Sequence, residues 1–409
     1  MLSLYIDPGT GSMLFSIIIG LVAMLYFVFK ALVIKLKFVF TGGKSNSSNT
    51  RHPLVIYSEG KKYWTVFKPI LDSLEQKSFK TVFYTSSKDD QVFEQNYKHI
   101  SSEYIGEGNK AFMKLNFLEA DVCLMTTPSL DVYQLKRSKG VKHYSHILHA
   151  VDDATGYRLF GLDYFDSVLL SGEYQKSHIR ILEEQRNIKP KELVVVGSPY
   201  LDTLNEKTKY FATENKNLTV LVAPSWGQNG ILSRYGPSLL DHLVETGFHI
   251  IVRPHPQSKE SEKDVLIKLE NKYNNKSNFE WDYNTENLNS LSRADIMISD
   301  FSGVIFDYAF LFDKPFLYLN SDFDHRPYDS YDINELPWKF KILPQIGAEL
   351  KKQDFNKISE IIINTIDSST LKGNRQKAKE TAWQHIGESG IRTAEFLVNK
   401  VKELNEEIK

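Results

Sequence analysis

The sequence has very little cysteine and almost no net charge. Its 409 residues include a single cysteine, Cys123, which excludes an internal disulfide and any zinc-finger spacing. Lysine plus arginine (50) and aspartate plus glutamate (51) nearly cancel, which leaves a formal charge of -1. No global field therefore favours a nucleic acid as a partner. Cys123 lies in the apolar run ADVCLMTT, and we interpret it as a small core residue.

Charge is also absent from a long stretch near the N-terminus. Residues 12–29, SMLFSIIIGLVAMLYFVF, have no charged side chain, and this length approaches the ~20 residues that cross a bilayer. No basic residue precedes the stretch and lysines follow it, which is unlike a signal peptide. By the positive-inside rule we expect a single-pass anchor in residues 1–40, in the cell membrane, with the catalytic body in the cytoplasm. A buried hairpin helix or an in-plane anchor is the alternative.

Beyond a polar, Gly- and Ser-rich linker at 41–50, short apolar runs alternate with helical stretches in two successive series. The runs are continuously apolar, as in strands covered on both faces, and strands separated by helices imply parallel βαβ units. We expect an α/β fold with two Rossmann-like domains facing a cleft. These are 51–205 and 206–385, followed by a C-terminal helix at 386–409.

A strand-to-helix turn in ADIMISDFSGVIFDYAFLFD is the first place that could carry chemistry, because ligands of such folds lie at strand ends. Ser299, Asp300, Ser302 and Gly303 end an apolar run and open a helix, where backbone N–H groups and the helix dipole suit a phosphate. A helix cap is the alternative. Asp307, which lies among apolar residues, would be costly without a partner, and we expect a ribose hydroxyl or a cation.

A second strand end, IIVRPHPQS, places Arg253 and His255 beside two prolines. A guanidinium and an imidazole are donors of different geometry that together suit a diphosphate. Taken alone, a proline-flanked histidine is more often a structural turn residue.

In the first half, His149 ends the apolar run of SHILHAVDD. A neutral imidazole, with an unperturbed pKa near ~6.5, can act as the base for an attacking hydroxyl. His143 and His146 are competitors that lie farther from the strand end. Asp152 and Asp153 either orient His149 or solvate the loop. No metal-ligand spacing is recognised, so we predict neither a metal site nor a cofactor.

Together these motifs resemble the CDP-glycerol glycerophosphotransferase family of teichoic-acid synthesis. RPHP resembles the family's R-x-H-P turn, and SDFSGVIFDYAFLFDKP resembles its S-D-x-S-[SG]-x-x-x-D-x-x-x-x-x-K-P segment. ILHAVDDATGYRLF looks like its W-H-G-x-x-x-K loop, and VVGSPYLDTL is similar to its G-x-P-R-x-D interdomain segment. The resemblance spans residues 140–345.

The resemblance implies a GT-B architecture and a membrane-anchored transferase, with 51–205 on the acceptor side and 206–385 on the nucleotide-donor side. Such an enzyme would move glycerol phosphate, or a similar polyol phosphate, from a CDP-activated donor to a hydroxyl of a lipid-linked cell-wall polymer intermediate. The resemblance assigns catalytic roles to His149, as general base, and to His255, which would stabilise the diphosphate. It assigns donor binding to six other residues: Arg253, Ser299, Asp300, Ser302, Gly303 and Asp307.

The sequence departs from the family pattern in the loops next to the substrates. Leu148 and Ala150 replace a Trp and a Gly, and Trp338 stands where a Gly is expected. The nearest basic residue in the loop after His149 is Arg158. Two alternatives therefore stay open: a GT-B glycosyltransferase that uses a nucleotide-sugar in surface polysaccharide synthesis, and a non-catalytic, membrane-tethered binding protein. The sequence does not indicate an oligomeric state.

Overall fold

The structure is a computed structural model that describes residues 51–211, 217–320 and 323–406, together with 21–22, 24–26 and 29. The chain divides by its internal contacts into two units, Met1–Arg51 and His52–Lys409. Most of the expected anchor, and the whole linker at 41–50, lie outside the described residues. Among the described residues, no helix has the length and apolar character needed to cross a membrane.

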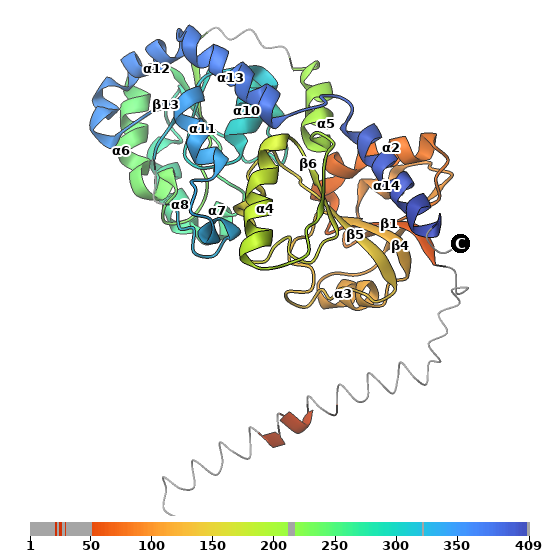
Figure 1. Cartoon of the computed structure of the whole chain (residues 1–409). Coiled ribbons are helices and arrows are strands. Elements are labelled where there is room, and N and C mark those ends of the chain that lie inside the picture. The colour runs from red at the N-terminus through yellow and green to blue at the C-terminus, as the bar shows by residue number, and fades with distance from the viewer. Residues whose placement is uncertain are drawn as a thin grey trace, which may run out of the picture. The chain divides into compact units, whose positions relative to one another are not determined.

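The first half of the His52–Lys409 unit is built on a seven-stranded parallel sheet with the order β3-β2-β1-β4-β5-β6-β7 (Figure 1). Every residue of β4 and β6 is buried, which explains why these runs are continuously apolar rather than alternating. The strands are β1 (His52–Ser58), β2 (Thr81–Thr85), β3 (Ile100–Tyr104), β4 (Ala120–Met125), β5 (Val141–Ile147), β6 (Ser167–Leu170) and β7 (Glu192–Val195).

The second half repeats the plan with a six-stranded parallel sheet of order β10-β9-β8-β11-β12-β13. Both sheets reverse their strand order beside the first strand, between β1 and β4 and between β8 and β11. Ligands of open α/β sheets bind at this switch point, outside the carboxyl ends of the strands. The strands are β8 (Thr219–Val222), β9 (His249–Val252), β10 (Phe279–Trp281), β11 (Ile296–Ser299), β12 (Phe316–Tyr318) and β13 (Ala348–Glu349).

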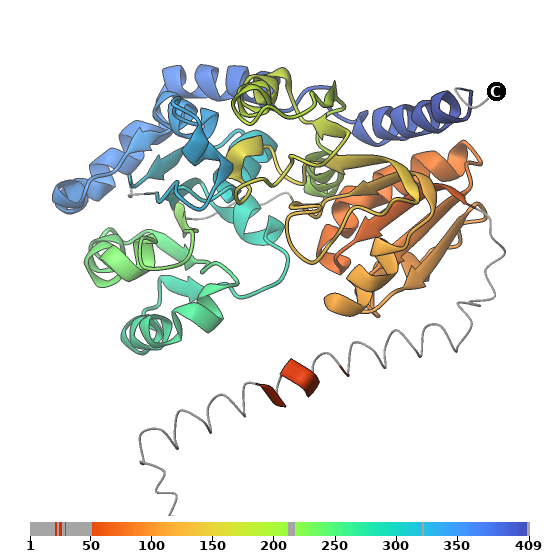
Figure 2. The ribbon, with the colours of Figure 1, turned by 60° about the horizontal axis from the view of Figure 1, so that its bottom comes forward.

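Helices connect the strands of each half and cover the sheets (Figure 2). In the first half they are α2 (Trp64–Gln76), α3 (Asn109–Asn116), α4 (Lys176–Gln185) and α5 (Pro199–Thr208). In the second they are α6 (Ile231–Glu245), α7 (Ser258–Ser261), α8 (Lys263–Tyr273), α9 (Leu288–Arg293), α10 (Val304–Phe312), α11 (Trp338–Ile346), α12 (Ile358–Ile366) and α13 (Ser369–Ala382). Short 3₁₀ turns are η1 (Lys61–Tyr63), η2 (Gln91–Glu94), η3 (Ala154–Gly156), η4 (Glu173–Gln175), η5 (Asp329–Asp332) and η6 (Lys352–Lys357).

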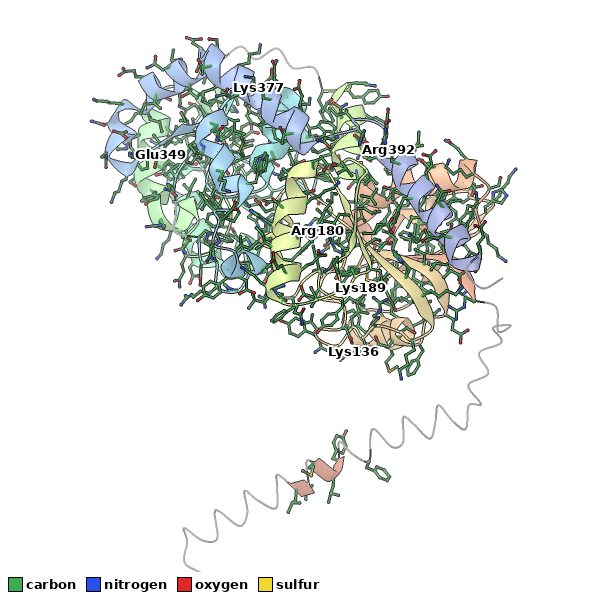
Figure 3. The ribbon with its side chains drawn as sticks, viewed as in Figure 1. Lys136, Arg180, Lys189, Glu349, Lys377 and Arg392 are labelled. Carbon is green, nitrogen blue, oxygen red and sulfur yellow. The ribbon has the colours of Figure 1, made fainter. Side chains whose placement is uncertain are left out.

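The last helix, α14 (Ser389–Glu406), returns to the first half and lies beside α2 (Figure 1). Its apolar face shares a buried core with that helix, including Leu397 and Phe67. Figure 3 marks the outer side of α14 at Arg392 and that of α13 at Lys377. The structure thus has a helix over Ser389–Glu406, within the range 386–409 of the predicted C-terminal helix.

Asp202, in the segment predicted to join the halves, binds the segment between α13 and α14, through which the chain returns to the first half. Its Oδ1 accepts hydrogen bonds from Trp383 Nε1 (2.9 Å) and from the Gly387 backbone N–H (2.8 Å). Gly197, in the VVGSPYLDTL segment, has φ 94°, and a Cβ there would lie 2.5 Å from the Gln384 carbonyl oxygen. Glycine is thus required by backbone conformation and by close approach. The domain boundaries at 205/206 and 385/386 stay predictions.

Candidate functional site

His149 lies two residues beyond β5, at the carboxyl edge of the first sheet, and is half-buried. Its Nδ1 is 3.3 Å from the hydroxyl of Tyr157, and its ring meets the ring of Tyr63 edge-on with centroids 5.4 Å apart. Burial lowers the pKa of His149 below its usual value, and the Lys62 ammonium lowers it further, whereas Asp152 opposes the shift. At neutral pH the imidazole is therefore uncharged and able to accept a proton.

The two competing histidines are less accessible. His146 is fully buried, its Nε2 is 3.0 Å from the Tyr157 hydroxyl, and burial lowers its pKa to about 3. His143 is also buried, with Nε2 2.9 Å from the hydroxyl oxygen of Ser167. Of the three, His149 alone is open to a substrate.

The loop after His149 is held from the second half of the unit. Both carboxylate oxygens of Asp153 accept backbone hydrogen bonds at the start of α11, from Trp338 and Lys339 at 2.8 Å each. The Lys339 ammonium donates to Asp152 Oδ2 at 2.6 Å. The two aspartates therefore fasten the loop to α11, rather than orienting His149 or facing solvent. Lys339 thus places a cation from α11 beside Asp152.

A second set of contacts clamps the next part of the same loop. Asp329 accepts hydrogen bonds from the backbone N–H groups of Phe160 (2.7 Å) and Gly161 (3.1 Å). Arg186 pairs with Asp329 and with Asp163 at 2.7 Å each, and these three side chains are at most 9% exposed. Burial outweighs the arginine and raises the pKa of Asp329 to about 6. The position of the loop therefore depends on the 325–339 segment of the other half.

In the second half, Asp300 organises two turns at once. Its Oδ1 accepts from the backbone N–H groups of Ser225 (2.9 Å) and Ser302 (3.2 Å), and its Oδ2 accepts from Ile231 at the start of α6 (3.2 Å). Ser299 is fully buried and donates to the Ala223 carbonyl at 2.6 Å. Asp300 and Ser299 therefore shape the turns, whereas Ser302 and Gly303 remain accessible for a ligand.

Arg253 is held inside its own half. One guanidinium nitrogen donates to Asp282 Oδ2 at 2.5 Å, and the other donates to the backbone carbonyls of Asn284 (2.8 Å) and Thr285 (3.4 Å). These two residues line a hollow of about 500 Å³ together with Phe211, Glu286 and Asn289. Arg253 thus supports the 282–285 loop, and the structure does not place it beside the 300–303 turn as a free donor.

His255 presents one ring nitrogen toward its own turn. Its Nδ1 accepts a hydrogen bond from the Gln257 backbone N–H at 3.1 Å, which fixes the ring beside α7. Within the described chain, Nε2 receives no hydrogen bond. Trp226, an exposed side chain of the turn after β8, has its ring centroid 6.3 Å from that of His255. Because β8 and β9 are neighbours, the two rings lie at the carboxyl edge where a ligand is expected.

Asp307 has a protein partner. The Tyr200 hydroxyl of α5 donates to its Oδ2 at 3.0 Å, and burial raises the pKa of Asp307 to about 7. This contact joins α5 to α10, so the expected ribose hydroxyl or cation is not needed to satisfy the carboxyl group. Within the described ranges, no group of three His, Cys, Asp or Glu side chains is arranged to hold a metal ion.

The loop that follows the predicted base approaches the predicted phosphate turn at the junction of the halves. A Cβ on Gly303 would lie 3.9 Å from Asp152 Oδ2, and Asp152 is the third residue after His149. Sequence reasoning did not single out Tyr63, Tyr157 or Lys339. No local signal identifies Lys339, because its partner is 187 residues away in the sequence.

Two parallel sheets of this order, with polar loops at their carboxyl edges, define a GT-B-like α/β protein. The chain is similar to a putative UDP-N-acetylglucosamine 2-epimerase from Listeria monocytogenes, with 14% identity, TM-score 0.54, and coverage of 88% of this chain and 98% of that one. It is also similar to the UDP-GlcNAc 2-epimerase of Methanocaldococcus jannaschii in complex with UDP-GlcNAc and UDP (16%, 0.53, 85% and 99%). A third similar structure is the wall teichoic acid polymerase TagF soaked with CDPG (13%, 0.51, 86% and 89%). At these identities the likeness shows the fold alone.

Residues 163–333 match the family model described as CDP-glycerol:poly(glycerophosphate) glycerophosphotransferase. The match confirms the resemblance to this family over that part of the chain, and it supports a CDP-glycerol glycerophosphotransferase-like activity. The matched range contains Arg253, His255 and the 299–307 segment, and it begins after His149. No curated protein sequence matches the chain.

Proposed function

We propose that this enzyme transfers glycerol phosphate, or a similar polyol phosphate, from a CDP-activated donor to a hydroxyl of a lipid-linked, teichoic-acid-type polymer intermediate. The observation that carries the proposal is the position of His149. It is an uncharged, half-buried imidazole whose loop touches the 300–303 turn through Asp152 and Gly303. The family match and the fold shared with a wall teichoic acid polymerase support the donor and the polymer class.

In the proposed reaction the acceptor oxygen attacks the phosphorus atom that carries the glycerol. The bond from that phosphorus to the bridging oxygen breaks, CMP leaves with the electron pair, and a phosphodiester forms. His149 Nε2 takes the proton of the acceptor hydroxyl. His255 Nε2, the backbone N–H of Gly303 and the accessible side chain of Ser302 stabilise the charge on the phosphates, which is the main requirement of phosphoryl transfer.

Nucleotide release distinguishes this reaction from transfer of a sugar. The full-length protein is incubated with CDP-glycerol, CDP-ribitol and UDP-GlcNAc, each with a membrane extract as acceptor source, and the released nucleotide is quantified. Release of CMP supports the proposal, whereas release of UDP with sugar incorporation supports a GT-B glycosyltransferase. Absence of acceptor-dependent release from all donors would favour the binding-protein alternative.

His149→Ala tests the base directly. General-base catalysis contributes about 10²- to 10⁴-fold, so kcat should fall by that amount while donor KM changes little. The control is Lys189→Ala, an exposed lysine marked in Figure 3, which should retain wild-type rates. Near-normal transfer by His149→Ala would remove His149 from the mechanism.

We further propose that residues 1–40 anchor the enzyme in the cell membrane with its body in the cytoplasm. The uncharged stretch at 12–29 and the lysines after it support this arrangement. Deletion of residues 1–44 should leave turnover of a soluble acceptor analogue intact and impair that of the lipid-linked acceptor. Equal losses on both acceptors would contradict a role in membrane attachment.

A further inference from the structure

Three side chains, one of which is the proposed base, form a continuous hydrogen-bonded chain. The Tyr157 hydroxyl is 3.0 Å from His146 Nε2 and 3.3 Å from His149 Nδ1, so one oxygen bridges the two imidazoles. A hydroxyl can donate one hydrogen bond and accept two, and a neutral imidazole donates through one nitrogen and accepts through the other. The protons of the three groups are therefore not independent.

The chain is held rigidly. The rings of Tyr157 and His146 meet at 89° with centroids 5.2 Å apart, and His146 comes from the buried strand β5. The backbone carbonyl of Tyr157 accepts from the Asp329 N–H at 2.9 Å, and a Cβ on Gly161 would lie 2.5 Å from the Cβ of Tyr157. The tyrosine is thus fixed between β5 and the 325–339 segment.

The nearest carboxylate does not orient His149. Asp152 uses Oδ2 for the Lys339 ammonium and Oδ1 for the Asp153 backbone N–H. The hydrogen-bond partner that the structure gives to His149 Nδ1 is the Tyr157 hydroxyl. An imidazole that is to accept a proton at Nε2 must carry its own proton on Nδ1, and the partner of Nδ1 decides which tautomer is present.

We propose that Tyr157 is a positioning residue: with His146 it holds His149 in the tautomer that has its proton on Nδ1 and a free lone pair on Nε2. The inference rests on the proposed role of His149 as base. His149 Nδ1–H donates to the Tyr157 oxygen, and the Tyr157 hydroxyl donates to His146 Nε2. His146 then carries its proton on Nδ1. That atom makes no hydrogen bond of ordinary geometry in the described chain, while the backbone of Thr127 is the neighbour that favours a proton on this ring.

All members of this chain are neutral, which distinguishes it from a carboxylate–histidine pair. Burial lowers the pKa of His146 to about 3 and raises the pKa of the Tyr157 hydroxyl well above its usual value. The charged and titratable groups facing His149 and Tyr157 from other elements are Lys62, Tyr63 and Glu59, together with Asp152 in the same loop. Without a carboxylate hydrogen-bonded to the ring the imidazolium gains little, which agrees with the lowered pKa of His149 that its burial causes.

The tautomer can be measured without any substrate. In the full-length protein with ¹⁵N-labelled histidine, the His149 signals are assigned as those lost in His149→Ala. The wild type should show a protonated Nδ1 and an unprotonated Nε2. Tyr157→Phe removes the acceptor oxygen and should give a mixture of the two tautomers. A wild-type His149 with its proton on Nε2 would overturn the proposal, as would an unchanged tautomer in Tyr157→Phe.

Kinetics provide the second measurement. Tyr157→Phe should lower kcat by about 10- to 100-fold, the usual cost of removing an orienting partner, with little change in either KM. Tyr174→Phe is the matched control, because its hydroxyl bonds the Asp152 carbonyl of the same loop at 3.2 Å and does not touch the histidines. Equal losses in the two variants would indicate a structural effect on the loop and count against the tautomer role.

The two readouts separate this inference from the proposed function. If His149→Ala is fully active while the wild-type tautomer is as expected, the proposed base is wrong and the hydrogen-bonded chain is structural. If His149→Ala is inactive but the tautomer is insensitive to Tyr157→Phe, the base stands and the positioning role fails.

Discussion

The loop after β5 and the turns after β8 and β11 lie at corresponding edges of the two sheets, but they are held in different ways. The turns of the second half are organised by their own carboxylate, Asp300, which accepts three backbone hydrogen bonds within that half. The loop that follows His149 is fastened by Asp329 and Lys339 from the other half. The proposed donor turns are therefore self-supporting, whereas the position of the proposed base depends on the junction between the halves.

Arg186→Met should have the largest effect on stability, because it removes the buried cation that pairs with both Asp163 and Asp329. It leaves Asp163 and Asp329 without their counter-ion, and removing one partner of a buried pair costs about 3–5 kcal/mol. Urea unfolding monitored by circular dichroism measures the free energy of unfolding. Arg392→Met, at an exposed i,i+4 pair on α14 (Figure 3), is the control and should change it by less than about 0.5 kcal/mol.

The loss of stability in Arg186→Met should also depend on pH. The Asp329 pKa is already raised to about 6 in the folded protein, and loss of the arginine raises it further. A carboxyl group with a raised folded pKa favours the folded state when protonated, and that contribution is lost as pH rises. The deficit of Arg186→Met should therefore be smallest at pH 5 and grow toward pH 8. A deficit below about 1 kcal/mol at pH 8 would mean that the clamp contributes little.

Asp300→Ala should have a smaller effect, confined to the donor side. It leaves the backbone N–H groups of Ser225, Ile231 and Ser302 without their acceptor, and a buried unsatisfied group costs about 1–3 kcal/mol. Because the turns move but the His149 loop does not, donor KM should rise while acceptor KM stays constant. Initial rates at varied donor and acceptor measure both.

Asp264→Ala, at an exposed position in the first turn of α8, is the control for Asp300→Ala and should behave as the wild type. If Asp300→Ala raised both KM values equally, the two sides of the site would not be independent. The contrast between the donor turns, which are held within their own half, and the His149 loop, which is held by the other half, would then be wrong.

The parts of the site that the sequence predicts are those that depend on local pattern. A continuous apolar run indicates a buried parallel strand, and such a run can be recognised from a few consecutive residues. Both sheets are therefore predictable from the sequence. The RPHP turn and the Ser/Asp segment are also short local motifs, so they could be found in the same way. Cys123, in the middle of β4, is fully buried, as its apolar surroundings indicate.

The partners of these residues were not predictable, because they are distant in sequence. Arg253 was assigned to a diphosphate, but its guanidinium donates to Asp282, which directly follows β10 and lies 29 residues away in the sequence. Asp307 was left without a protein partner, and Tyr200, 107 residues earlier, supplies one. A buried polar group must be satisfied, which follows from physical chemistry, but the chain topology decides which side chain satisfies it.

Lys62→Met should have the smallest effect and concerns the electrostatics of the base alone. The Lys62 ammonium lies 4.8 Å from the centroid of the Tyr63 ring, and that ring meets the ring of His149 edge-on. The Lys62 ammonium lowers the pKa of His149. Its removal should raise that pKa toward the usual value, so fewer molecules have a neutral base at pH 6, while none is affected at pH 8. Transfer at pH 6 should fall by less than about fivefold, because an exposed charge pair is worth about 0.2–1 kcal/mol.

High salt should reduce the difference between Lys62→Met and the wild type, since it screens an exposed charge. Lys61→Met, in the same 3₁₀ turn but paired with Asp89 at 2.5 Å, should leave the pH profile unchanged. A loss in Lys62→Met that is equal at pH 6 and pH 8 would instead place Lys62 in contact with a substrate and show that the first half, like the second, binds charge directly.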